Sequence, residues 1–234
     1  MRISPVILLF AFLLAIPAGL CGQDDIQQAE KEEMPQKYTR ALMTNPLTTL
    51  WGTVPLTAEY RLCYLFINSQ KQASELSFSY LGRGPLLGIL EQDSVYQNRD
   101  IHFIVRGFRF QAEQKFYIPA LSNQLISDGD YAPFGIYIAP HLSYASVKFS
   151  SKYFNLYDIY IAVSQFNVNM KAGMQFRILG RFTADFFGGL GYKNNVWAQH
   201  YSSTNIQRLD LDEIPGFYKG HLKIMLGFNA GILF

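Results

Sequence analysis

Apolar and polar residues alternate along most of the chain after residue 41, and the segment 222–234 is the clearest example. One face of this segment is entirely apolar and consists of Leu222, Ile224, Leu226, Phe228, Ala230, Ile232 and Phe234. A period of two is that of a β-strand with one apolar and one polar face. Ordinary strands have about 5–6 residues, whereas a tilted strand that crosses a membrane needs about 9–11. The segment is therefore predicted to be a membrane-spanning strand.

The same alternation recurs in six further segments, at 54–63, 74–82, 101–118, 134–149, 166–178 and 182–193. A less regular first strand is placed at 41–51, because a closed barrel of this type has an even number of strands. Short turns are expected near 65–72, 119–131 and 179–181, and longer polar connections at 83–100, 150–164 and 195–218. The chain is thus predicted to be all-β, a transmembrane eight-stranded antiparallel up-and-down β-barrel.

The charged residues decide between a membrane barrel and a soluble one. A soluble β-sandwich or lipocalin-like barrel would hide its apolar face and expose its charges. Here the charges share the face that would point into the lumen of an eight-stranded barrel, which side chains just fill. We expect the lumen network to contain Glu59, Arg61, Glu75, Arg109, Glu113, Lys115, Lys171, Arg177, Asp185 and Lys223.

The N-terminus has the pattern of an export signal. Arg2 precedes the apolar run 6–16, which is too short to span a bilayer. We predict a signal peptide at 1–22, a flexible periplasmic tail at 23–40 and the barrel at 41–234. Two alternatives are a retained anchor and lipidation of Cys21, although Leu20 fits a lipoprotein signal poorly. The predicted location is the outer membrane.

The composition supports this assignment. Hydrophobic residues make up 49% of the chain, aromatic residues 15% and charged residues 16%, below the usual 25% or so of charged residues. The mean hydropathy of +0.04 is too low for a bundle of membrane helices. The net charge of +2 gives no nucleic-acid signature, and two cysteines exclude a disulfide scaffold. No metal site and no cofactor are expected, since the histidines show no metal-ligand spacing.

Several stretches resemble a family of small Gram-negative outer-membrane barrels of unknown function, similar in design to the OmpX and OmpW type. They are the hairpin around Asn45-Pro46-Leu47 and Glu59-Tyr60-Arg61, the segments 110–117 and 132–137, the runs 176–180 and 189–192, and the final Ile232-Leu233-Phe234. The resemblance covers about residues 41–234. It implies the barrel fold and no activity.

Three kinds of function remain open from the residues. The first is a structural or interaction role in the cell envelope, through the surface loops or within an envelope complex, with a salt-bridged lumen that holds the barrel closed. The second is a narrow conduit for ions or small hydrophobic solutes. The third is a lipid-modifying hydrolase, because His141 and Ser143 share a face and Glu113 lies on the neighbouring strand, as in a triad. The non-enzymatic role is preferred, because so short a motif often occurs by chance.

The last strand also predicts how the barrel is assembled. Phe228, Ile232 and Phe234 lie on its outward face, and such a strand resembles the signal that the outer-membrane barrel-assembly machinery reads. The expected partners are therefore outer-membrane lipid and this machinery, together with an envelope complex, and no nucleic acid is expected.

Overall fold

The computed structural model describes residues 38–50, 52, 54, 56–69, 71–91, 103–118, 134–151, 159–178, 180–202, 205–208 and 220–234. The predicted signal peptide at 1–22 and most of the predicted tail lie outside the described residues. The described strands are β1 (Arg40–Thr44), β2 (Thr57–Ser69), β3 (Gln72–Arg83), β4 (Phe103–Tyr117), β5 (Gly135–Ser151), β6 (Tyr160–Arg177), β7 (Phe182–Ser202), β8 (Asn205–Arg208) and β9 (Leu222–Leu233). The described helices are α2 (Leu47–Leu50) and α3 (Pro85–Glu91).

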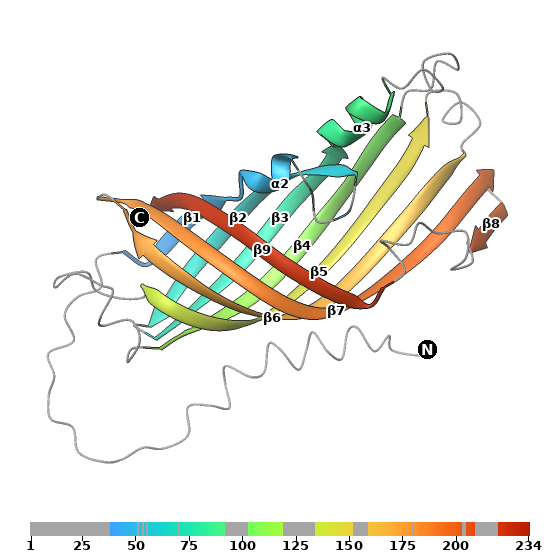
Figure 1. Cartoon of the computed structure of the whole chain (residues 1–234). Coiled ribbons are helices and arrows are strands. Elements are labelled where there is room, and N and C mark those ends of the chain that lie inside the picture. Colours follow the sequence, from blue (N-terminus) through green and yellow to red (C-terminus); the bar gives the residue numbers. More distant parts are fainter. Residues whose placement is uncertain are drawn as a thin grey trace, which may run out of the picture. The chain divides into compact units, whose positions relative to one another are not determined.

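Eight of these strands form a closed antiparallel ring (Figure 1). Strands β1 to β7 pair in chain order, β7 pairs with β9, and β9 pairs with β1. The short β8 pairs only with the last residues of β7, from Ala198 to Ser202, and is not part of the ring. The predicted transmembrane eight-stranded up-and-down barrel is therefore confirmed. No helix among the described residues is long and apolar enough to cross a bilayer.

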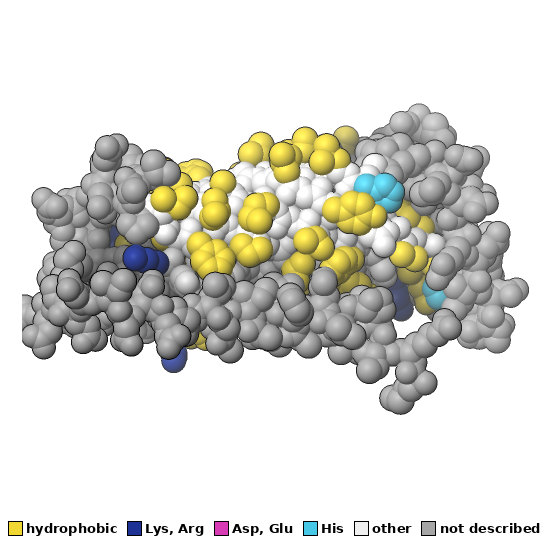
Figure 2. All heavy atoms as spheres, turned by 90° about the horizontal axis from the view of Figure 1, so that it is seen from below, with side chains coloured by type: hydrophobic (Ala, Val, Ile, Leu, Met, Phe, Trp, Pro, Cys, Tyr) yellow, Lys and Arg dark blue, Asp and Glu magenta, His cyan; other side chains and the backbone are white. Residues whose placement is uncertain are grey.

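The two faces of the wall differ as the alternation predicts. Outward side chains are apolar and exposed, for example Leu76 at 54%, Phe110 at 53% and Phe186 at 48%, while their inward neighbours are buried. Figure 2 shows hydrophobic side chains spread along the barrel wall, with basic side chains near both of its ends and histidines toward one end. An apolar outer surface around a charged interior is stable in lipid and unstable in water.

The barrel has a terminal end and a loop end. The terminal end carries Arg40 and Phe234, whose backbones bond to each other, with the Arg40 N–H donating to the Phe234 oxygen at 3.1 Å. The loop end lies opposite, beside α3 (Figure 1). Two hairpins at the terminal end are short, namely the β2–β3 connection between Ser69 and Gln72 and the β6–β7 connection between Arg177 and Phe182. The turn predicted near 119–131, between β4 and β5, lies outside the described residues. The β6–β7 turn includes Gly180 with φ of +55°, a backbone conformation that favours glycine.

The first strand is shorter than predicted. The expected strand at 41–51 ends at Thr44, and the chain then turns into α2. Pro46 has no N–H for a sheet ladder, and the Asn45 side-chain oxygen accepts from the backbone N–H groups of Leu47 (3.1 Å) and Thr48 (3.3 Å). Local capping therefore replaces strand pairing at this point.

Three other predicted boundaries are wrong. The second strand is Thr57–Ser69 rather than 54–63, and Val54 is buried in an apolar cluster instead of facing outward. The loops predicted at 150–164 and 195–218 are partly strand, because β6 already begins at Tyr160 and β7 continues to Ser202. In these extensions apolar and polar side chains occur on both faces, as with Ile161 and Gln165 on one face of β6 and Ala162 and Ser164 on the other. The hydrophobic alternation therefore fades there although the pairing continues.

Candidate functional site

The polar interior of the barrel lies between two apolar clusters. The cluster at the terminal end contains Ala41, Met43, Cys63, Leu65, Ile67, Ala73, Tyr117, Phe134, Tyr137, Ala139, Phe187 and Leu233. The cluster at the loop end contains Val54, Leu81, Leu87, Val105, Ala145, Val147 and Val163. Because inward residues of β4 alternate along the strand, Lys115, Glu113, Gln111 and Arg109 mark successive levels between the two clusters.

Lys115 organises the level nearest the terminal end. Its ammonium lies 2.7 Å from Asp185 and 3.0 Å from Glu75, and all three side chains are buried. The Tyr137 hydroxyl donates to the second oxygen of Asp185 at 2.8 Å. Tyr137 can lie across the lumen because the residue opposite it is Gly173, where a Cβ would stand 2.5 Å from the hydroxyl oxygen. One lysine thus joins carboxylates from two different strands.

The next level pairs Lys171 on β6 with Glu113 on β4. The Lys171 ammonium also lies 4.3 Å from the centre of the Phe187 ring, a cation–π contact. Phe187 folds over Gly227 on β9, where any Cβ would collide with the ring. These contacts fix the lysine against one side of the lumen.

Glu59 is the centre of the third level. Its oxygens accept from Arg61 (2.9 and 2.7 Å), Ser79 (2.8 Å), Arg109 (3.2 Å) and Gln111 (3.3 Å). Arg61, on the same strand, and Arg109, from β4, therefore share one buried carboxylate. Two cations that face one anion leave this level positive.

The structure buries nine of the ten charged residues predicted for the lumen. They are Glu59, Arg61, Glu75, Arg109, Glu113, Lys115, Lys171, Asp185 and Lys223. The tenth, Arg177, is half-buried as the last residue of β6, at the terminal end. Lys223 differs from the others, because its ammonium has no hydrogen-bond partner among the described residues.

The residues suggested as a triad do not bond to one another. Asn169 donates to Nδ1 of His141 at 2.9 Å, so Nε2 carries the proton and donates to Gln111 at 3.1 Å. The Ser143 hydroxyl accepts from Arg109 and from Asn167, each at 2.9 Å. Glu113 pairs with Lys171 instead of orienting the histidine. No imidazole nitrogen is left to accept a serine proton.

The alternation places the uncharged Gln111, Asn167, Asn169 and Gln175 on the polar face of their strands, but the predicted lumen network contains charged residues only. Phe187 was missed, although it has the same parity as Asp185 and so could have been assigned to the interior. Asn169, His141, Gln111 and Glu59 form a continuous hydrogen-bonded chain across the lumen. The selection of charged residues alone hid these connections.

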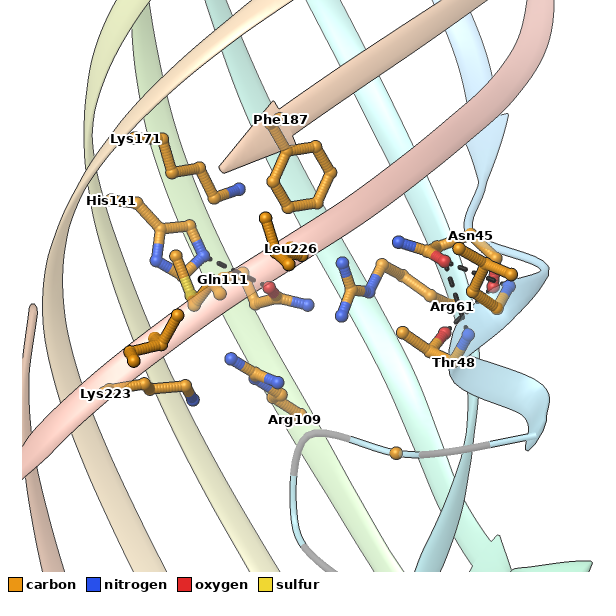
Figure 3. A pocket seen from close by; sticks show the side chains of 14 residues that line it. Asn45, Thr48, Arg61, Arg109, Gln111, His141, Lys171, Phe187, Lys223 and Leu226 are labelled. Carbon is orange, nitrogen blue, oxygen red and sulfur yellow. Dashed lines mark hydrogen bonds between the residues drawn. The ribbon is translucent and has the colours of Figure 1, made fainter. Parts of the chain in front are cut away.

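A cavity of about 310 Å³ opens from this interior toward β9 (Figure 3). Its polar lining includes Arg61, Arg109, His141, Lys171 and Lys223, together with Thr48 of α2 and Asn45 just before it. No aspartate or glutamate belongs to its described lining. Among the described residues, no group of acidic, histidine and cysteine side chains could hold a metal ion.

Comparison with known proteins adds little to this description. No protein-family model matches the chain, so the resemblance to the small barrels of unknown function stays a prediction, and no curated protein matches it in sequence. Among solved structures, the chain is similar to a major outer membrane protein from Thermus thermophilus. The two share 9% identity with a TM-score of 0.46, over 85% of this chain and 100% of the other.

Proposed function

We propose that the protein is a non-enzymatic outer-membrane barrel that serves a structural or interaction role, with its terminal end in the periplasm and its loop end outside. The observation that carries this proposal is the interior itself. Buried ion pairs and hydrogen bonds join β2, β3, β4, β6 and β7 across the lumen, while apolar side chains face outward. Because the lumen is filled, the surface loops are the part of the barrel that would bind a partner. Outer-membrane barrels have short turns on the periplasmic side and longer loops on the outer side.

The same interior argues against a conduit along the barrel axis. An ion would have to pass an apolar cluster at each end and displace paired charges between them. Separation of a buried ion pair costs about 3–5 kcal/mol when the remaining charge stays buried without a partner. The second candidate, an axial conduit, therefore lacks a path among the described residues.

Planar bilayers test the closed lumen. We expect the purified protein to insert without stable conductance steps, because the clusters around Val147 and Leu65 close both ends. A porin reconstituted in the same bilayer serves as the positive control, since its wide barrel holds an aqueous channel. Reproducible open steps from this protein alone would support the conduit and contradict the proposal.

We also propose that the barrel-assembly machinery recognises the outward face of β9, with Phe228, Ile232 and Phe234. The Phe234 ring is half exposed and contacts Tyr64 edge-on, at 6.2 Å between ring centres. Phe234→Ala should therefore reduce the amount of protein in the outer membrane severalfold, while refolding of the purified chain in detergent changes little.

The matched control is Phe182→Ala, which removes an equally outward ring at the terminal end of β7. Membrane levels and refolding should stay near normal for this variant. If both variants reach the membrane equally well, Phe234 acts as an ordinary interfacial aromatic and has no assembly role.

A further inference from the structure

The barrel wall is incomplete on one side of β9. Strand β1 pairs with β9 only from Ala41 to Thr44, opposite Ala230 to Leu233. Beyond that point the chain leaves the sheet as α2. Residues 222–229 of β9 therefore have no strand partner on this side among the described residues, although they pair with β7 on the other.

Thr44, Thr48 and Gly52, which lie in and around α2, bond to the edge of β2 and not to that of β9. Thr44 Oγ1 donates to the Arg61 carbonyl (2.7 Å) and Thr48 Oγ1 to the Glu59 carbonyl (3.0 Å). The Gly52 N–H donates to the Thr57 carbonyl at 2.7 Å. Side-chain hydroxyls and one amide thus replace a strand along β2. On the side of β9, no hydrogen bond from a described residue fills the gap.

The backbone of β9 turns polar groups into this gap. Leu233 donates to Arg181 on the β7 side, and Phe234 donates to Arg40 on the β1 side. In an antiparallel strand the N–H and C=O of one residue point the same way and alternate between sides. The peptide groups of Leu222, Ile224, Leu226 and Phe228 therefore face the gap. Unpaired peptide groups in hydrocarbon cost several kcal/mol each, so the gap favours an occupant that can form hydrogen bonds.

The cavity lies directly behind the gap and is positively charged. Figure 3 shows Lys223 and Arg109 on one side of it, Arg61 beside α2 and Lys171 near Phe187. Arg61 and Arg109 share Glu59, Lys171 is paired with Glu113, and Lys223 has no partner. The Nε of Arg109 is also buried without a hydrogen-bond partner among the described residues. Arg109 is 0% exposed and Lys223 8%, so each residue has a buried donor that lacks an acceptor among the described residues.

The rim of the cavity is apolar. Leu226 is 86% exposed and Ile224 69%, more than the other large hydrophobic side chains described on the wall, and Leu47 of α2 also lines the cavity. A ligand that enters here therefore meets hydrocarbon at the rim and cations behind it. This order matches an amphiphile with an anionic head and an apolar chain.

We infer that this cavity binds the anionic headgroup, a phosphate or a carboxylate, of a membrane amphiphile that enters sideways between α2 and β9. The inference rests on the membrane location proposed above. The headgroup oxygens accept from Lys223 and Arg109, and the chain lies along Leu226 and Ile224 in the bilayer. A second copy of the chain could pair with β9, but it would leave the two buried donors unsatisfied.

The test uses the full chain in neutral maltoside micelles and measures binding by isothermal titration calorimetry. Dodecyl phosphate is the probe, inorganic phosphate tests the head alone, and dodecanol tests the chain alone. We expect saturable binding of dodecyl phosphate and much weaker binding of the other two. Equal affinity for inorganic phosphate would show that the site binds an anion without its apolar chain, which would contradict the inference. The absence of saturable binding would also overturn it.

Lys223→Gln is the decisive variant, because removal of an unpartnered lysine leaves no other group unpaired. Loss of one charge-assisted hydrogen bond should weaken dodecyl phosphate binding about tenfold. Lys148→Gln is the matched control, since Lys148 lies on the exposed face of β5 against Tyr160. Gel mobility without heating checks that both variants are folded.

Equal loss in the two variants, or none in either, would contradict the assignment. Light scattering separates the alternative occupant: a stable dimer without phosphate binding would show that a second copy covers β9. The bilayer conductance described above is independent of this result, so a failed binding test leaves the closed barrel standing. Conversely, conducting barrels that still bind dodecyl phosphate would overturn only the proposed closed lumen.

Discussion

Replacement of Glu59 by alanine is expected to lower the free energy of unfolding by about 3–5 kcal/mol, because it leaves buried cations without their counter-charge. Glu59 is fully buried and accepts from both Arg61 and Arg109. Urea unfolding in lipid vesicles, followed by tryptophan fluorescence, measures the change. This should be among the most damaging single substitutions in the interior.

The control is the double variant Glu59→Ala with Arg109→Met. Removal of one orphaned cation should recover part of the lost stability, since coupled residues are not additive. A loss below about 1 kcal/mol for Glu59→Ala, within the range of exposed ion pairs, would mean that water reaches these arginines and that the lumen is open.

Phe110→Arg is expected to cost about 2–4 kcal/mol of stability in lipid, the penalty for an arginine near the bilayer midplane on the outer face of a barrel. Phe110 lies at the centre of β4, points outward and contacts Phe78 and Phe108, at 5.1 and 5.5 Å between ring centres. Unfolding in lipid vesicles measures this difference directly.

Gln114→Arg provides the matched control on the same strand and face. Gln114 lies nearer the terminal end and already hydrogen-bonds to Ser74 at 2.6 Å. An arginine near the interface should cost only about 0–1 kcal/mol. Equal effects of the two substitutions would mean that the outer wall of β4 does not cross a membrane.

The sequence predicts the wall of this barrel well because its two environments are so different. In β9, each residue faces either lipid or lumen, so the strict period of two follows from solvation alone. The same reasoning assigns Lys115, Glu113 and Asp185 to the interior. It says nothing of their partners, because ion pairs such as Lys115–Asp185 join residues far apart in sequence and depend on the register of several strands.

The prediction fails where local hydrogen bonds compete with the sheet. Residues 45–50 are expected to continue the first strand, yet Asn45 and Thr48 bond within the turn and to β2. Asn-Pro is a turn signal that could have ended the strand at Thr44. The cavity could not be predicted, because it exists only where this turn leaves β9 uncovered.

The short first strand also governs how the ring closes. Only four residue pairs join β1 to β9, whereas eighteen join β6 to β7. The β6–β7 hairpin needs a closed loop of a few residues, but the β1–β9 pairing must bring together the two ends of the barrel sequence. Closure therefore loses much chain entropy for few bonds. We expect the β1–β9 pairing to form last and to limit the rate of folding.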